Sequence, residues 1–201
     1  MRSRLIFLPI GLVVGSLLTC AAVWANVFRA HVDTDGNSIG RPVNDVASGA
    51  LHTVQIAGLC LQGADRAKIT DVRPTGVLGE VQITNFTLTP MQAIGNSRAV
   101  SLDDYVEDLD EFYAGPPTRR LSTQCSEGYD HRGLVVELKA PSRSELPVAA
   151  SGFAVDYEVR GMSKSVDVRT TFAFCADDER DDHLLELNDE DGAPFDFLCE
   201  A

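Results

Sequence analysis

The 201-residue chain is poor in basic residues, with 17 lysines and arginines against 30 aspartates and glutamates, a formal net charge of −13. Only Arg2 and Arg4 are charged within residues 1–28, so the remainder carries 15 basic and 30 acidic groups, or −15. A surface this negative repels phosphate backbones, which argues against nucleic-acid binding. It repels anionic lipid headgroups for the same reason and attracts cations or basic partners.

Motifs for nucleotide binding and for nucleophilic catalysis are missing as well. The sequence has no Gly-rich phosphate loop and no dinucleotide fingerprint. GMSKS at 161–165 approaches the G-x-S-x-G elbow, but it lacks the closing glycine and falls in a predicted hairpin. No nucleophile is evident near His31 in the tether or His183 in the acidic segment. We expect each histidine to be a solvated surface residue: His31, His52, His131 and His183. We therefore expect no enzymatic activity, no catalytic residues and no cofactor.

A long uncharged run follows the two basic residues at the N-terminus. It extends over 24 residues, Leu5 to Phe28, which is enough for a helix to cross a hydrocarbon core of about 30 Å. The positive-inside rule places the N-terminus in the cytoplasm and the rest of the chain outside. We favour an uncleaved anchor over residues 1–28, with Trp24 at the outer interface. Cleavage near Ala25 would instead secrete the protein, and lipidation of Cys20 is a third route to export.

Close cysteine pairs are also absent. The smallest gap among the four cysteines after Cys20 is 24 residues, whereas zinc sites use pairs such as C-x-x-C. An even set in an exported domain predicts two disulfides instead. Three pairings fit the sequence, and we favour Cys60–Cys125 together with Cys175–Cys199. Cys20 lies inside the apolar run and has no evident partner.

Alternating hydrophobicity dominates the chain from residue 51 onward. Residues 29–50 mix Gly, Asn, Asp, Ser and Pro without periodicity, which predicts a flexible tether. FAVDYEV (153–159) and VDVRTTFAF (166–174) alternate with period two, as half-buried antiparallel strands do, and the short link with Gly161 predicts a hairpin. A change of phase predicts a bulge near Asn85. Further strands are expected at 52–60, 67–74, 81–88 and 134–138.

These strands predict the class of fold. SLDDYVEDLDEFYAGPP (101–117) has helical spacing and a capping start at Ser101, which predicts an amphipathic helix over one edge or end of the sheet. Six or seven strands with one inserted helix predict a mainly β domain over 51–201, an antiparallel immunoglobulin-like β-sandwich. The single tryptophan lies in the apolar run, so the Cys…Trp…Cys pattern of true immunoglobulin domains is absent.

Nine acidic residues lie between positions 176 and 192. An EF-hand loop is excluded there and at VDTDGN, because placing Gly192 or Gly36 at position 6 leaves no oxygen ligand at position 12. The favoured interpretation is a solvated segment, and no metal site is expected. A different calcium site would draw on carboxylates of this segment, Asp177, Asp178, Asp181, Asp182, Asp189 and Asp191.

From its N-terminus the chain has a basic start, an apolar run, a polar tether and a cysteine-containing β-domain. Within the domain, GLC…AKITDVRP leads into VQITNFTL. This pattern loosely resembles uncharacterised exported proteins of actinobacteria, and the resemblance extends over the whole chain. The resemblance implies a signal-anchored β-domain and no activity. We therefore expect a non-catalytic extracytoplasmic binding or accessory domain with a protein partner. The alternatives are a calcium-dependent structural or adhesion module and, third, an envelope hydrolase.

Overall fold

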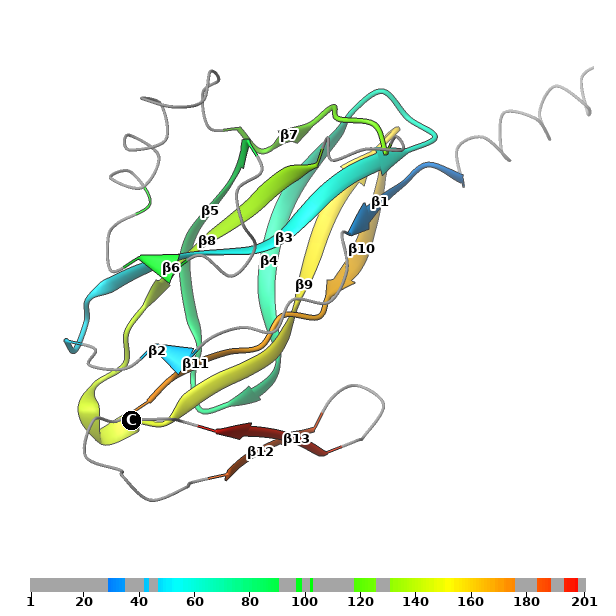
Figure 1. The fold of residues 1–201 in the computed structure, drawn as a ribbon. Helices are drawn as coiled ribbons and strands as arrows, with labels where there is room; N and C mark the ends of the chain where they lie inside the picture. Colours follow the sequence, from blue (N-terminus) through cyan, green and yellow to red (C-terminus); the bar gives the residue numbers. More distant parts are fainter. Residues whose placement is uncertain are drawn as a thin grey trace, which may run out of the picture.

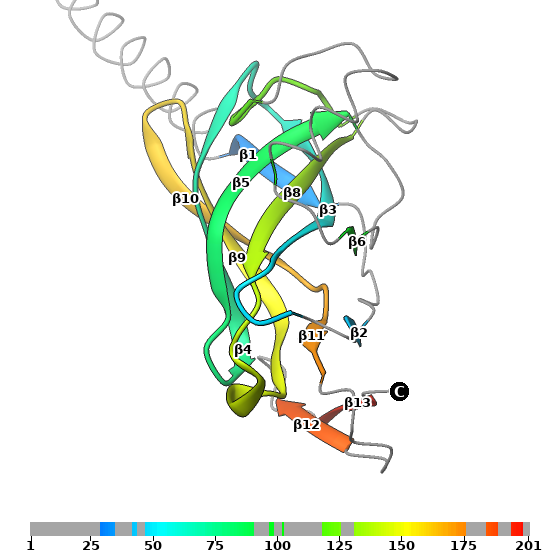
Figure 2. The ribbon, with the colours of Figure 1, turned by 90° about the vertical axis from the view of Figure 1, so that its left-hand side faces the viewer.

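The computed structural model describes residues 29–34, 42–43, 47–90, 97–98, 102, 118–125, 131–175, 184–188 and 194–198. These residues form a mainly β structure of two sheets that pack around a shared core, with a separate two-stranded hairpin (Figures 1 and 2). The prediction of a mainly β, antiparallel protein is confirmed. No helix in the described ranges is long and apolar enough to span a membrane.

The first sheet has the strand order β1-β3-β8-β5, with the short strand β6 pairing β3, and all its pairs are antiparallel. The strands predicted at 52–60, 81–88 and 134–138 are confirmed. The predicted bulge is also confirmed, because the register of β5 against β8 shifts between Ile83 and Asn85. The strands are β1 (His31–Thr34), β3 (Leu51–Gln62), β5 (Gln82–Pro90), β6 (Ser97–Arg98) and β8 (Arg132–Lys139).

The second sheet has the order β2-β11-β9-β4-β7, with β10 also pairing β9. Its pairs are antiparallel except for β2 with β11, which run parallel. The strands are β2 (Pro42–Val43), β4 (Ala67–Leu78), β7 (Arg120–Leu121), β9 (Val148–Val159), β10 (Met162–Val168) and β11 (Phe172–Phe174). The separate hairpin pairs β12 (Leu184–Asn188) with β13 (Pro194–Leu198).

The hairpin of β9 and β10 is confirmed, but the strand predicted over 166–174 is divided. Arg160 and Gly161 form the turn, and both have the positive φ that a two-residue type I′ turn requires. β10 ends at Val168 and β11 begins at Phe172, so the prediction of one continuous strand is wrong. Between them, the buried Thr170 Oγ1 donates a hydrogen bond to the carbonyl oxygen of Ile56 at 2.6 Å.

The break in that strand has a physical cause in the opposite sheet. Ile56 falls at a shift in the register of β3 against β8, between Gln55 and Ala57, so it is left out of the pairing. A buried carbonyl without a partner is costly, and the hydroxyl of Thr170 satisfies it from the facing sheet. The strand is therefore divided at Thr170, although Val168, Thr170, Phe172 and Phe174 all stay buried as the alternation predicts.

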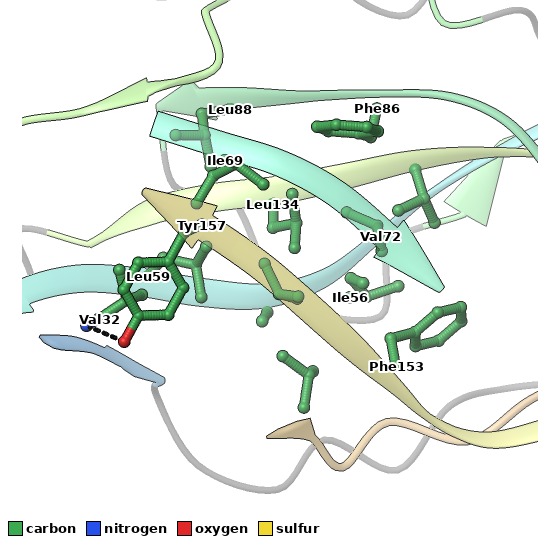
Figure 3. Close-up of a cluster of buried hydrophobic side chains, with 14 of the residues drawn as sticks. Val32, Ile56, Leu59, Ile69, Val72, Phe86, Leu88, Leu134, Phe153 and Tyr157 are labelled. Carbon is green, nitrogen blue, oxygen red and sulfur yellow. Dashed lines mark hydrogen bonds between the residues drawn. The ribbon is translucent and has the colours of Figure 1, made fainter. Parts of the chain in front are cut away.

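The core lies between the two sheets, as the period-two pattern predicts (Figure 3). Phe153, Val155, Tyr157 and Val159 are at most 2% exposed, while Glu158 between them is exposed. The first sheet contributes residues such as Ile56, Leu59, Leu88 and Leu134 to the same cluster. Burying each large apolar side chain contributes about 1.5–3 kcal/mol, so this cluster is the main source of stability.

The outer face of the first sheet is buried too. Glu137 is only 9% exposed and accepts a hydrogen bond from the backbone N–H of Leu102 at 2.7 Å, and a second from the hydroxyl of Thr84. Leu102 is itself 4% exposed and belongs to the helix predicted at 101–117, whose other residues lie outside the described ranges. The carboxylate therefore ties Leu102 to β8.

The prediction of a flexible tether is wrong for two segments of residues 29–50. His31–Thr34 forms β1 on the edge of β3, and Pro42–Val43 forms β2 beside β11. Val32 is buried, and its backbone N–H donates a hydrogen bond to Tyr157 Oη at 3.2 Å (Figure 3). These strands are too short for their alternation to be recognised. The first 28 residues, including the predicted anchor, lie outside the described ranges.

Candidate functional site

A groove of about 600 Å³ lies at the end of the sandwich where β4 and β8 finish and β5 begins. Its polar lining comes from three separate parts of the chain. The walls between them include Gly79, Ala140, Pro141 and Val148. The polar side chains that line it are Ser48, Glu80, Gln82, Lys139, Ser142 and Glu145.

Three strands fix the middle of the groove. Lys139 is the last residue of β8 and pairs with Leu51 of β3 on one side and Gln82 of β5 on the other. Directly paired residues point to the same side of a sheet, so Lys139 and Gln82 present an ammonium and an amide together. Both side chains are exposed. The strand register therefore holds a cation and a neutral hydrogen-bonding group side by side.

One carboxylate of the groove is held by a short capping structure. Glu145 ends the 3-10 helix Arg143–Glu145 and accepts hydrogen bonds from the Ser142 hydroxyl at 2.7 Å and the Ser142 backbone N–H at 2.8 Å. These two hydrogen bonds lower the pKa of Glu145, because they favour the charged form. The groove therefore keeps a negative charge at mildly acidic pH.

Gly79 allows the loop before β5 to approach the start of β9. Its φ is +71°, and a Cβ there would lie 2.9 Å from Cγ2 of Val148, closer than real Cβ contacts. A side chain at this position would therefore force the loop and Val148 apart. With Glu80, Glu145 and Lys139 the lining has a formal charge of −1, and its serines and amide add hydrogen-bonding groups. Such a lining suits a polar ligand that carries positive charge.

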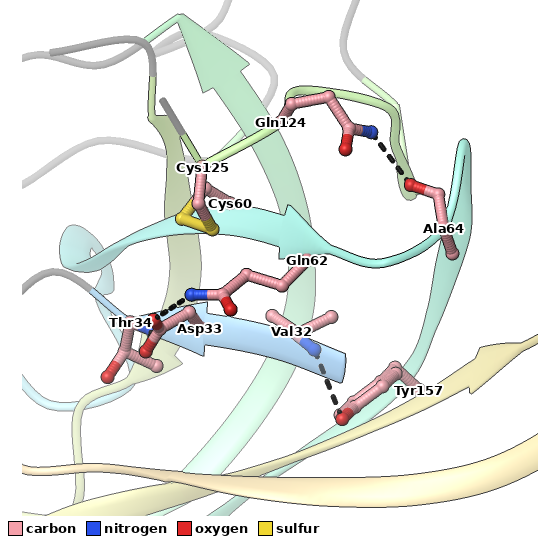
Figure 4. Close-up of a disulfide and its surroundings, with 9 residues drawn as sticks. All are labelled: Val32, Asp33, Thr34, Cys60, Gln62, Ala64, Gln124, Cys125 and Tyr157. Carbon is pink, nitrogen blue, oxygen red and sulfur yellow. Dashed lines mark hydrogen bonds between the residues drawn. A yellow bond between two sulfur atoms is a disulfide. The ribbon is translucent and has the colours of Figure 1, made fainter. Parts of the chain in front are cut away.

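The disulfide between Cys60 and Cys125 is confirmed (Figure 4). Cys60 is 2% exposed, and its neighbours Leu59 and Leu61 belong to the core cluster, so Cys60 projects from the other face of β3. Backbone hydrogen bonds join the same segments, from Leu61 N–H to Thr123 O at 2.8 Å and from Cys125 N–H to Leu61 O at 3.1 Å. The bridge therefore fastens residues 123–125 beside β3.

The second predicted bridge is only partly visible. Cys175 is 2% exposed and disulfide-bonded. Cys199 lies outside the described ranges, so its pairing with Cys175 stays a prediction. Within the described ranges no three His, Cys, Asp or Glu residues gather as metal ligands would. The candidate calcium ligands are not among the described residues: Asp177, Asp178, Asp181, Asp182, Asp189 and Asp191.

The histidines divide between the surface and the interior. His31 is exposed, as expected, and its Nδ1 lies 2.8 Å from the carbonyl oxygen of Arg29. The prediction of a surface position is wrong for His52, which is 5% exposed and packs edge-on against Phe174 with ring centroids 5.3 Å apart. His131 is half-buried, and His183 lies outside the described ranges. Burial lowers the pKa of His52, because desolvation penalises the imidazolium.

The buried His52 predicts a loss of stability in mild acid. As pH falls below about 6.5 the unfolded state takes up the proton first, because the pKa of His52 is lower in the folded state. Above that pH the free energy of unfolding is therefore expected to stay at its full value. As the pH falls further, it is expected to decline until the pH is below the pKa of His52 in the folded state. Urea unfolding of wild type and His52→Phe between about pH 7 and pH 5 measures the difference in slope. Equal slopes in the two proteins would contradict the assignment, and His31→Gln is the exposed control.

The chain matches no protein-family model, and no curated protein matches it with significant similarity.

Sequence reasoning missed the groove and the buried polar residues. The Ser-x-x-Glu spacing of Ser142 and Glu145 is a capping-box signal that could have located one carboxylate. The sequence has no signal of a groove at Glu80, Gln82 and Lys139, because these residues lie at or beside strand ends that only the sheet register brings together. Glu137 carried no signal either, because its burial depends on contacts with Leu102 and Thr84, which are distant in sequence.

Proposed function

We propose that this chain is an exported, membrane-anchored binding or accessory domain without catalytic activity. The groove that ends with Lys139 and Glu145 carries the proposal, because its polar groups are held by strand register and capping while its lining stays open to solvent. Its lining residues lie where β4 and β8 end. In Figure 1 these strand ends lie at the end of the sandwich opposite to the start of β1. A groove placed there would face away from the membrane.

Two further observations support export. A disulfide between Cys60 and Cys125 is typical of proteins in an oxidising compartment. The uncharged run Leu5–Phe28 has the length of a membrane span and ends three residues before β1. We propose residues 1–28 as an uncleaved anchor, with release by cleavage near Ala25 as the alternative.

We also propose that the fold is an immunoglobulin-like sandwich with one inserted helix. Two packed sheets with mainly antiparallel neighbours support an immunoglobulin-like sandwich. The hydrogen bond from Leu102 N–H to Glu137 supports an inserted helix near residues 101–117 that covers the first sheet. The disulfide differs from the inter-sheet bridge of antibody domains, because Cys60 projects away from the core.

The proposed ligand is a polar segment of a protein partner that carries a basic side chain. Glu80 and the capped Glu145 would accept hydrogen bonds from an arginine or lysine, and Gln82 would bind the ligand's backbone. Losing one charge-assisted hydrogen bond costs about 1.5–3 kcal/mol, which weakens binding roughly tenfold to a hundredfold.

Selection of short random peptides displayed on phage against the full-length protein in nanodiscs tests this function. We expect the selected peptides to be rich in arginine and lysine, and to lose about tenfold or more in affinity for Glu80→Gln. Asp167→Asn removes the same charge from the exposed face of β10 and should leave the Kd unchanged. Selected peptides that bind Glu80→Gln as tightly as wild type would contradict the groove as the binding site.

A further inference from the structure

The chain is docked on the sandwich from its first described residues. Ala30 is fully buried, and its carbonyl oxygen accepts a hydrogen bond from Lys164 Nζ of β10. Two residues later Val32 is bound through its backbone N–H to Tyr157 (Figure 4). We define the proximal end as residues 29–31, 62–68, 120–121 and 158–164, which meet where the chain joins the sandwich (Figures 1 and 2).

The proximal end has a charge opposite in sign to that of the chain. It holds six basic and two acidic side chains, a formal charge of +4, within a protein of −13. At the opposite end, β12 and β13 contribute Glu186 and Asp196 and no basic residue (Figure 2). The basic residues are Arg29, Arg66, Lys68, Arg120, Arg160 and Lys164, all exposed except the half-buried Lys164, and the acidic residues are Asp65 and Glu158.

Strand pairing groups these charges on one part of the surface. Lys68 of β4 pairs with Arg120 of β7 on one side and Glu158 of β9 on the other. Arg66 lies in the turn that precedes β4, and Arg160 lies in the turn between β9 and β10. Four separate strand ends therefore contribute to a basic surface that no run of the sequence displays.

We propose that the proximal end lies against the membrane and binds anionic lipid headgroups. The inference rests on the proposed anchor, whose uncharged run ends at Phe28. Ala30 is docked two residues later, and two extended residues span at most about 7 Å. Charges on exposed surfaces act over about 8–10 Å at physiological ionic strength, so the basic residues lie within reach of the headgroups. Lysine and arginine clusters beside a membrane segment attract anionic lipids in this way.

The absence of a spacer between Phe28 and β1 favours lipid over a soluble acidic partner as the occupant. The anchor holds the proximal end permanently at the membrane surface, where the effective concentration of headgroups is high. A soluble acidic partner would have to enter this narrow space and would meet the same surface only transiently. Binding of the proximal end also directs the acidic β12–β13 end and the groove away from the bilayer. This orientation is favourable, because anionic headgroups repel negatively charged groups.

Hydrogen–deuterium exchange of the full-length protein in phosphatidylglycerol and in phosphatidylcholine vesicles tests the proposal. We expect amides of residues 62–66 and 160–164 to exchange at least threefold more slowly in phosphatidylglycerol, and the difference to vanish at about 0.5 M salt because of screening. Arg66→Glu lowers the formal charge of this end to +2 and should reduce the protection. Arg66→Glu with Arg120→Glu lowers it to zero and should abolish the protection.

The matched control is Arg143→Glu, which reverses an exposed charge near the groove at the opposite end and should leave the protection intact. Equal exchange rates in the two lipids, with the protein floating together with both kinds of vesicle, would overturn the lipid contact and leave the anchor standing. Failure to float with either kind of vesicle would contradict the anchor and the lipid contact together. The two proposals are therefore separated by the same experiment.

Discussion

Replacing Phe153 with alanine is expected to lower the free energy of unfolding by about 3–5 kcal/mol, because a buried ring is lost and a cavity remains. Phe153 is fully buried on β9, the strand that pairs with both β4 and β10 at the centre of the second sheet. For a chain of this length such a change corresponds to a fall in Tm of roughly 10 °C. Urea unfolding of the full-length protein in detergent measures the change.

Val77→Ala on β4 is the matched control for Phe153, because it truncates an apolar side chain that is 51% exposed. Surface substitutions of this kind usually change stability by less than about 0.5 kcal/mol. A loss below 1 kcal/mol for Phe153→Ala would show that the space between the sheets closes around the cavity. A large loss for Val77→Ala would instead show that this part of β4 is covered.

Removing the Cys60–Cys125 bridge is expected to have an effect of similar size. Its cysteines are 65 residues apart in sequence, and loop-closure entropy for that separation predicts about 4 kcal/mol of stabilisation. The double variant Cys60→Ala with Cys125→Ala isolates this contribution. Chemical reduction does not isolate it, because Cys175 is disulfide-bonded as well. The measurement is urea unfolding under oxidising conditions.

Ser165→Ala, on the exposed side of β10, serves as the neutral control for the cysteine variant. The hydrogen bonds between Leu61 and the segment of Thr123 and Cys125 remain in the double variant. A loss of less than 1 kcal/mol would mean that these hydrogen bonds already restrain the segment without the bridge. Retention of the native fold with a reduced Tm is the expected outcome.

Several strands were predictable because each is marked by local information. Alternation at Phe153, Val155 and Tyr157 reflects the two faces of a single strand, and no distant residue is needed to read it. The turn at Gly161 and the bulge near Asn85 are equally local. The division of the strand at 166–174 could not be read this way, because it depends on a hydrogen bond from Thr170 to Ile56, 114 residues away.

The burial of His52 and Glu137 depends on neighbours rather than on their own residue types. Phe174 packs against His52 from β11, and Leu102 contacts Glu137 through a hydrogen bond. The sign of the charge at each end of the sandwich likewise depends on which residues the fold brings together. A net charge of −13 predicts repulsion from anionic lipids, yet strand pairing places six basic side chains around the point where the chain joins the sandwich.

The sequence by itself determined the β class, the positions of the main strands, the even set of cysteines after Cys20 and the uncharged run before Arg29. Each of these follows from neighbouring residues or from residue counts. Only the tertiary structure decided the sheet order, the Cys60–Cys125 contact, the groove at Lys139 and the basic proximal end. These features join residues that are distant in sequence. Their positions follow from the register in which strands pair and from the packing of one sheet on the other, and no single segment encodes either.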